Sequence, residues 1–464
     1  IDATPPDAPD GEPVLSPQLA PVAPGMVAVL APVAPRPEGE RMLLSVGLVP
    51  GLSTDWTHIG RVEHVLSLDL IAGYSGGSSM VTVSGVVDIE RGNVWGLQLA
   101  GVAALAPRVG GIQVAGVAAV AGEVTGVQLA GTAAVADSVD GLQVGGVAVL
   151  ARRHGDSQLA GVAAVSNGRA AAQFAGVAAV AGSSATVQGA GVAAVARGSS
   201  NIQVGGVAAV AGGSSSLQIG GVAVAAGGTA NLQIAGVATN ARTGNIQIAG
   251  VTNVAKSANF QIAGLVNVAS HVRGVQIAPI NVARKADGVQ VGLINVGGSA
   301  DGFSFGLINI VPGGRADLEA AIDSSSLGTL MFRHGGNRWH NVYGVGGHNV
   351  DESGPADDVW MYGLGFGPSW NVAHSRVDLE AIGWQVNHGA RHSTDVSILG
   401  QLRLSVAHGI GPFAIVAGGA LNTYISDDHE SPLLTERRKP SSGDAMNDKV
   451  TVEVWPSAFV GIRM

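Results

Sequence analysis

The segment Ile202-Gln-Val-Gly-Gly-Val-Ala-Ala-Val-Ala211 is one copy of a sequence motif whose repeats make up half of the chain. Degenerate copies, with Thr82 and Ser304 in the glutamine position, complete sixteen units between about Met80 and Pro312. The repeat period is 14 or 15 residues. So short a period is typical of repeat proteins, in which each unit buries its apolar groups only by stacking on its neighbours. The repeat therefore decides the fold of this part of the chain.

Two amide side chains recur at fixed places in the repeat. The glutamines lie 14 or 15 residues apart, and a later set of asparagines lies 14 apart. Identical amides gain from stacking, because each can form a hydrogen bond with the next along the stack. The predicted ladder residues are Gln98, Gln113, Gln128, Gln143, Gln158, Gln173, Gln188, Gln203, Gln218, Gln233, Gln247, Gln261, Gln276 and Gln290, with Asn253, Asn267, Asn281, Asn295 and Asn309.

Length changes show the internal shape of a unit. The connector, which joins one copy of the motif to the next, is shorter in the units that start at Gln233 and Gln247. At Ala278-Pro279, by contrast, the motif itself is shortened. Such changes are tolerated at turns, because a strand interior would lose its register or a ladder hydrogen bond. Each unit therefore has two short strands and two turns.

Two arrangements fit such units. Coils that wind in one direction form a parallel β-solenoid with about 4.8 Å between layers. Alternatively, each unit is a transmembrane strand of a large antiparallel barrel, with the glutamines at alternating ends. Only the first arrangement explains a glutamine at a fixed place, and the repeats also hold few of the aromatic residues that membrane strands carry at the interfaces. We therefore predict an all-β fold with a parallel solenoid of about sixteen coils.

The buried face of each strand has two interpretations. Aliphatic residues flank the glutamine, as in Ile112 and Val114, so strand alternation puts them on one side and the amide on the other. The usual interpretation buries the aliphatic residues and exposes the amide row, and the alternative reverses the faces. Either way the sides of the rod are rich in Ala, Gly and Val, which favours flat packing against another copy, a lipid or a glycan.

Two resemblances follow from these residues. The segments Gln276-Ile-Ala-Pro-Ile-Asn281 and Gln290-Val-Gly-Leu-Ile-Asn295 resemble the Gln and Asn core of curlin repeats, which form β-solenoids, although curlin units are longer and carry a second glutamine. The whole layout is similar to bacterial surface-repeat proteins, whose function is mostly unassigned. These resemblances imply stacked coils and a surface location, and they bring no catalytic residue.

Composition narrows the class of protein. Charged residues make up 13 % of the chain, about half the usual share, and the formal charge of −9 gives no basic footprint for nucleic acid. Cysteine is absent, and the chain begins at Ile1 without a hydrophobic signal core, so we expect a processed, exported protein. The proline-rich leader, residues 1–38, is expected to be disordered.

The remaining boundaries come from changes in pattern. We expect residues 39–78 to form strands that pack with a C-terminal domain, residues 79–312 to form the solenoid, and residues 313–464 to form an antiparallel barrel or a capping sheet. The predicted barrel strands lie near 316–333, 338–348, 358–372, 376–388, 396–408, 412–425 and 449–464. A strand near 41–52 makes eight, which is enough to close a small barrel.

The C-terminal segment carries membrane signals. Val454 to Met464 resembles the terminal β-signal of outer-membrane barrels, with a closing methionine where phenylalanine is usual. Six aromatic residues are candidates for the membrane interface: Trp339, Tyr343, Trp360, Tyr362, Trp370 and Trp384. A soluble barrel that caps the solenoid is the alternative.

No catalytic, cofactor or metal motif stands out. His340 and His348 lack the spacing of a metalloprotease, Asp137 and Asp140 share a connector without a cleft, and the charged segment 426–449 is expected to be a solvated loop. We predict a non-enzymatic, exported protein of the outer membrane or cell surface. It is expected to act as a rigid spacer, adhesin or fibre-forming subunit that self-associates through its uncharged sides. The alternative is an outer-membrane pore whose repeats are membrane strands.

Overall fold

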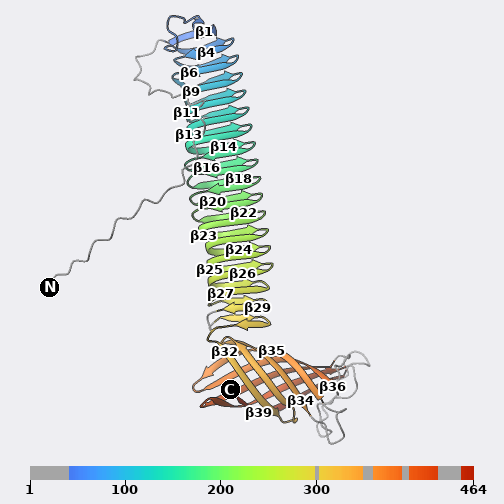
Figure 1. Ribbon diagram of the computed structural model, residues 1–464. Coiled ribbons are helices and arrows are strands. Elements are labelled where there is room, and N and C mark those ends of the chain that lie inside the picture. Colours follow the sequence, from blue (N-terminus) through green and yellow to red (C-terminus); the bar gives the residue numbers. More distant parts are fainter. Residues whose placement is uncertain (1–40, 298–301, 349–358, 389–396, 427–450) are drawn as a thin grey trace, which may run out of the picture.

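The computed structural model describes residues 41–297, 302–348, 359–388, 397–426 and 451–464. Every regular element in these ranges is a strand. The strands form a long parallel β-solenoid followed by a closed antiparallel barrel (Figure 1), which confirms the predicted fold class. The described part of the chain has no helix with the length and apolarity needed to cross a membrane. The predicted leader 1–38 and nearly all of the charged segment 426–449 lie outside the described residues.

Each coil of the rod has a glutamine strand and an alanine strand, and each pairs in parallel with its copy in the next coil. Gln113, for example, stands directly between Gln98 and Gln128. The separate glutamine strands are β8 (Leu97–Ala100), β10 (Ile112–Ala115), β12 (Val127–Ala130), β16 (Ala170–Ala175), β18 (Ala185–Ala190), β20 (Ser200–Gly205), β22 (Ser215–Gly220), β28 (Val289–Val291) and β30 (Phe303–Phe305).

The alanine strands follow across a two-residue turn. They are β9 (Ala103–Val109), β11 (Ala118–Val124), β15 (Ala163–Ser166), β17 (Ala178–Ala181), β19 (Ala193–Ala196), β21 (Ala208–Ala211), β27 (Ile280–Ala286), β29 (Ile294–Gly297) and β31 (Ile308–Ile310). In six places the alanine strand runs through the connector into the next glutamine strand: β13 (Ala133–Gly145), β14 (Ala148–Ala160), β23 (Ala223–Ala235), β24 (Ala238–Ala249), β25 (Thr252–Ala263) and β26 (Val266–Ile277).

The turn between the two strands requires glycine because the coils approach closely there. A Cβ atom on Gly206 would lie 1.9 Å from the carbonyl oxygen of Gly191 in the coil before it. Gly221 stands over Gly206 in the same way, at 2.0 Å. No side chain fits at that distance, so glycine recurs at this place for steric reasons.

The rod begins earlier than predicted. Its first strands are β1 (Arg41–Val49), β2 (Leu52–Ser53), β3 (Glu63–Asp69), β4 (Ala72–Ser75), β5 (Gly77–Ser84), β6 (Val87–Glu90) and β7 (Asn93–Val94). The glutamine column continues upward as Thr82, Ser67 and Ser45, each paired in parallel with the next. The prediction that residues 39–78 pack with the barrel is wrong, because these strands form the first coils at the far end of the rod.

The barrel is built only from the C-terminal segment. Its strands are β32 (Arg315–Asp323), β33 (Gly328–Gly335), β34 (Trp339–His348), β35 (Val359–Val372), β36 (Ser375–His388), β37 (Ser397–Ile410), β38 (Phe413–Ser426) and β39 (Thr451–Arg463). Strand β32 pairs with both β33 and β39 and so closes the barrel. The predicted strand 316–333 is in fact the hairpin β32–β33, which supplies the eighth strand in place of 41–52.

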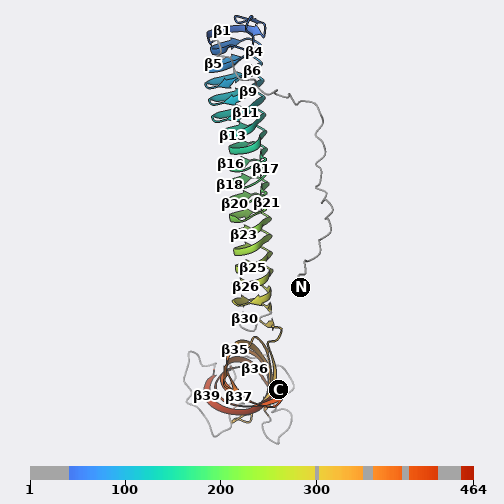
Figure 2. The ribbon, with the colours of Figure 1, turned by 90° about the vertical axis from the view of Figure 1, so that its left-hand side faces the viewer.

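The two parts meet at the foot of the rod (Figures 1 and 2). Figure 2 shows the barrel as a ring while the rod is seen lengthwise, so the barrel axis runs across the axis of the rod.

Candidate functional site

The glutamines form one continuous column inside the rod. Each side-chain Nε2 donates a hydrogen bond of 2.7–2.9 Å to the Oε1 of the glutamine in the preceding coil, from Gln113 to Gln290. From Gln98 to Gln247, the second Nε2 hydrogen reaches a backbone carbonyl across the coil. In the middle of the rod, Gln203 donates to Val210 O at 3.0 Å. The amides of these coils are therefore satisfied within the protein.

A second column runs beside it in the last coils. Asn253, Asn267, Asn281 and Asn295 each donate to the Oδ1 of the next asparagine at 2.8–3.0 Å, and Asn309 is the last member within the rod. These bonds point toward the barrel, whereas the glutamine bonds point away from it. The dipoles of the two columns therefore oppose each other where both are present.

The expectation of an exposed amide row is wrong. Gln203 is 0 % exposed, whereas its neighbour Val204 is 41 % exposed. The opposite strand contributes Ala194 and Ala209 to an interior that is only one small side chain deep. Stacked amides fit this narrow space and satisfy one another, whereas a row of bulky aliphatic side chains would overfill it. A glycan therefore cannot bind along the amide row, because the row is buried.

The asparagine column continues into the barrel. Asn309 Nδ2 donates to Asn341 Oδ1 on β34, and Asn341 Nδ2 donates to the carbonyl of Gly306 in the last coil. His334 Nδ1 donates to the carbonyl oxygen of Asn309 at 3.0 Å. Next to these bonds, the ring of Trp339 packs on Phe305 with centroids 4.5 Å apart. The open end of the solenoid is thus covered by the outer wall of the barrel.

The barrel interior holds charged side chains. Four arginines and three carboxylates, each at most 5 % exposed, form one network with His340. Arg315 donates to Asp378 at 2.8 Å, and Arg463 bridges Asp378 at 2.7 Å and Glu319 at 2.6 Å. The other members are Arg333, Arg403 and Glu380. The sequence did not lead us to predict this network. The available signal was that each of these charged residues alternates with outward aliphatic residues along its strand.

His340 belongs to this network. Its Nε2 lies 2.8 Å from Glu380, and its Nδ1 lies 2.9 Å from Ser369 Oγ. Among the described residues, no group of three or more His, Cys, Asp or Glu side chains is placed to hold a metal ion. The side chain of His348 lies outside the described residues.

The outer wall of the barrel is apolar. Leu404, at the middle of β37, is 52 % exposed, and Phe366 and Val460 are similarly exposed on β35 and β39. A soluble barrel has polar residues on its outside. An apolar exterior around buried ions is the pattern of membrane barrels, although the part of this interior away from the rod is packed with apolar side chains such as Met361, Trp384 and Leu399.

Five of the six interface candidates lie on the outer face. Trp339 and Trp370 lie near the rim that meets the rod, whereas Trp360 and Tyr362 lie near the opposite rim. Tyr343 stacks on His334, with ring centroids 5.3 Å apart.

Trp384 is not an interface residue, because it is 1 % exposed and lies in the barrel core. Its ring occupies the space beside Gly344 and Gly363, where an added Cβ would lie 2.4 and 2.6 Å from it. The two glycines on neighbouring strands make the room that this inward side chain fills.

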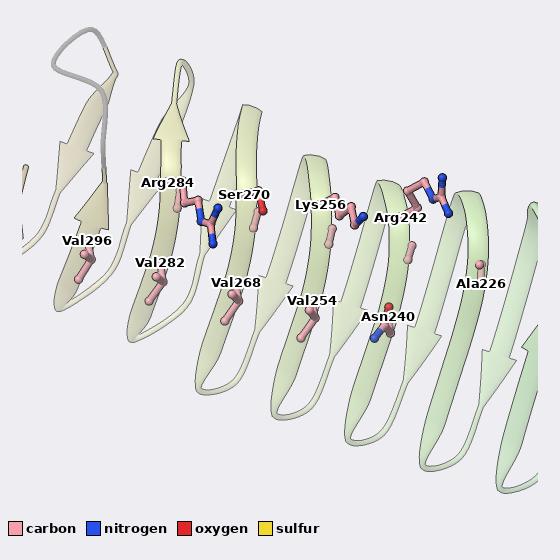
Figure 3. A pocket seen from close by; sticks show the side chains of 15 residues that line it. Ala226, Asn240, Arg242, Val254, Lys256, Val268, Ser270, Val282, Arg284 and Val296 are labelled. Carbon is pink, nitrogen blue, oxygen red and sulfur yellow. The ribbon is translucent and has the colours of Figure 1, made fainter. Parts of the chain in front are cut away.

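A shallow groove of about 720 Å³ runs along coils near the barrel (Figure 3). Arg242, Lys256 and Arg284 form a row on one edge, and Val254 and Val268 belong to a second row (Figure 3). Within the described residues, none of the three cations forms an ion pair, whereas Arg152, at the same place in an earlier coil, pairs with Asp137. The row can attract an anionic group, but no other feature of the described groove indicates a ligand.

The far end of the rod buries carboxyl groups. Asp88 and Glu90 on β6 occupy inward places that hold alanine in later coils, such as Ala104. Burial raises the pKa of Glu90 to about 8, and the adjacent Asp88 adds to this shift. Burial likewise raises the pKa of Asp88 to about 6, although Ser84 donates a hydrogen bond to it.

No family model matches the chain, and no curated protein or solved structure matches it.

Proposed function

We propose that this chain is a non-enzymatic structural protein of the outer membrane, in which the barrel spans the membrane and holds a rigid β-solenoid rod at one end. The observation that carries the proposal is the apolar outer wall of the barrel around a network of buried ions. In water, that wall would expose side chains such as Leu404, Phe366 and Val460 over all sides of the barrel. In lipid, the same wall is solvated and the ions stay inside.

The rod supplies the structural role. Its strands are hydrogen-bonded coil to coil, and two amide columns add further bonds along the same axis. Its sides carry rows of exposed aliphatic residues, such as Val204 and Ile219. These rows favour lateral contact with a second copy, which supports a rigid spacer or a fibre-forming subunit.

The pore alternative loses its structural basis. It requires that adjacent repeats run antiparallel as membrane strands, but they pair in parallel, as Gln113 with Gln98 shows. The eight-stranded barrel is also narrow, and its interior is filled by side chains such as Arg333 and Glu380. We expect no large conductance in a lipid bilayer.

The test compares the same substitution on the two apolar surfaces. Leu404→Arg places a charge at mid-height on the outer wall of the barrel, which costs about 2–4 kcal/mol if that wall faces lipid. We expect this variant to lose membrane insertion and the heat-dependent gel mobility of a folded barrel. Val204→Arg, on an exposed row of the rod, is the matched control and should insert normally. Equal insertion of the two variants would contradict a membrane role for the barrel.

A further inference from the structure

The two rims of the barrel differ in how their strands are connected. At the rim that meets the rod, β33 joins β34 through residues 336–338, β35 joins β36 through 373–374, and β37 joins β38 through 411–412. Each connection there has only two or three residues. The antiparallel register places all three on one rim, together with the start of β32.

The opposite rim carries the longer connections. On that rim, four, ten, eight and twenty-four residues of sequence separate the described strand ends, at 324–327, 349–358, 389–396 and 427–450. In bacterial outer-membrane barrels, the short turns face the periplasm and the long loops face outward. The strand bounds of this barrel therefore predict its orientation across the membrane.

We propose that the rod lies on the periplasmic face of the outer membrane and not on the cell surface. This inference rests on the proposed membrane-spanning barrel and specifies the compartment that the rod occupies. It replaces the surface location that the sequence suggested, because the rod leaves the barrel at the rim with the short turns. The partners that the rod can meet are then those of the periplasm, including a second copy of the chain.

The rod is fixed to this rim by contacts with rim residues. His334 is one residue from the end of β33, Trp339 begins β34, and Asn341 is two residues further. All three contact the last coil, through Asn309, Phe305 and Gly306.

The linker also prevents the rod from reaching the other rim. Only residues 311–314 separate β31 from β32, and they span at most about 18 Å when fully extended. The barrel strands are up to 14 residues long, which corresponds to about 45 Å. Even an undocked rod would therefore stay on the side of the short turns.

The experiment uses single cysteines in the full chain, which has none of its own. Ser184→Cys labels an exposed connector of the rod, His374→Cys labels the rim with short turns, and Ser326→Cys labels the opposite rim. Each variant is expressed in a bacterium with an outer membrane and treated with a maleimide that cannot cross membranes. The heat-dependent gel mobility of each variant is recorded as the check on barrel folding.

We expect Ser326→Cys to react in intact cells at least tenfold more than the other two variants. All three should react equally once the outer membrane is permeabilised. Strong labelling of Ser184→Cys in intact cells, with normal barrel mobility, would overturn the inference and leave the membrane barrel standing. Recovery of all three variants as soluble protein without the mobility shift would overturn the barrel proposal and this inference with it.

Discussion

At the scale of single residues, the fold depends on a glutamine that cannot be exchanged for a side chain of similar size. Gln203 accepts a hydrogen bond from Gln218, donates one to Gln188 and donates a second to Val210 O. Each bond is made in a closed interior where no water competes. The column therefore specifies the register of the coils as well as contributing to their stability.

Gln203→Ala is expected to destabilise the neighbouring coils by about 2–5 kcal/mol. The substitution leaves Gln188 Oε1 without its donor and Gln218 Nε2 without its acceptor, and it opens a cavity. Hydrogen exchange of the amides in coils 188–218 measures the effect. Val204→Asp, on the exposed face, should change the same exchange by less than about 1 kcal/mol. If the aspartate is the more damaging change, the assignment of the buried face is wrong.

The sequence predicted the stacking of the glutamines but not the side they face. The period alone places Gln98, Gln113 and Gln128 above one another, and the structure has them so. The orientation depends on the depth of the interior, which alanines such as Ala194 set from the opposite strand. Period-2 alternation is the same for either face, so the usual rule of aliphatic residues inside led to the wrong choice.

At the scale of elements, the first coils differ from the rest because they bury acids in place of alanines. Asp88 Oδ2 and Glu90 Oε1 have no hydrogen-bond partner among the described residues. A buried carboxyl in that state is more stable when protonated. The far end of the rod is therefore sensitive to pH in a way that the alanine-filled coils are not.

We expect the first coils to open more readily as the pH rises from about 4.5 to about 8, with no further change from Glu90 above that range. The folded state keeps the proton on Glu90 up to its raised pKa, whereas the unfolded segment releases it near the ordinary value of 4.5. The stabilisation from the protonated Glu90 is thus complete at low pH and is lost as the pH rises. The equilibrium constant for opening increases by up to about tenfold per pH unit. Hydrogen exchange of residues 63–90, corrected for its intrinsic pH dependence, measures this.

Glu90→Gln is the control for the pH effect, because glutamine has nearly the same shape and no charge. The variant should lose most of the pH dependence of the first coils and leave the coils around Gln203 unchanged. An unaltered pH dependence in Glu90→Gln would show that another group is responsible.

Element boundaries were the weaker part of the sequence prediction. Residues 41–49 have the alternation of a barrel strand, but β1 pairs with β3 of the rod. The polar residue Ser45 in the glutamine place was the available signal, because it aligns with Ser67 and Thr82. The turn at 324–327 divides a stretch that reads as one strand, since Ser324 to Ser326 carry no glycine or proline to mark it.

At the scale of the whole molecule, the rod and the barrel are coupled by the continuation of the asparagine column. Asn341 on the barrel wall takes the place that one further coil would occupy. It bonds to both Asn309 and Gly306.

Asn341→Ala is expected to loosen the last coil without unfolding either part. The amide of Asn309 loses its partner in the barrel, so exchange at residues 303–310 should increase by about tenfold or more. Asn245→Ala is the matched control, because Asn245 also bonds to an asparagine of a neighbouring coil but is on the exposed edge of the rod. Faster exchange at Gln203 or loss of the barrel mobility in Asn341→Ala would mean that the coupling is not local.

The crosswise setting of the barrel determines how far the molecule reaches and in which direction. A barrel that stands upright in a bilayer would hold this rod parallel to the bilayer plane, at the level of the lipid head groups. The eighteen layers from Ser45 to Ser304, at about 4.8 Å each, give a lateral arm of about 85 Å. As the barrel turns about its own axis, the arm sweeps a disc of that radius, so one anchored chain can touch or exclude neighbours far beyond its own footprint.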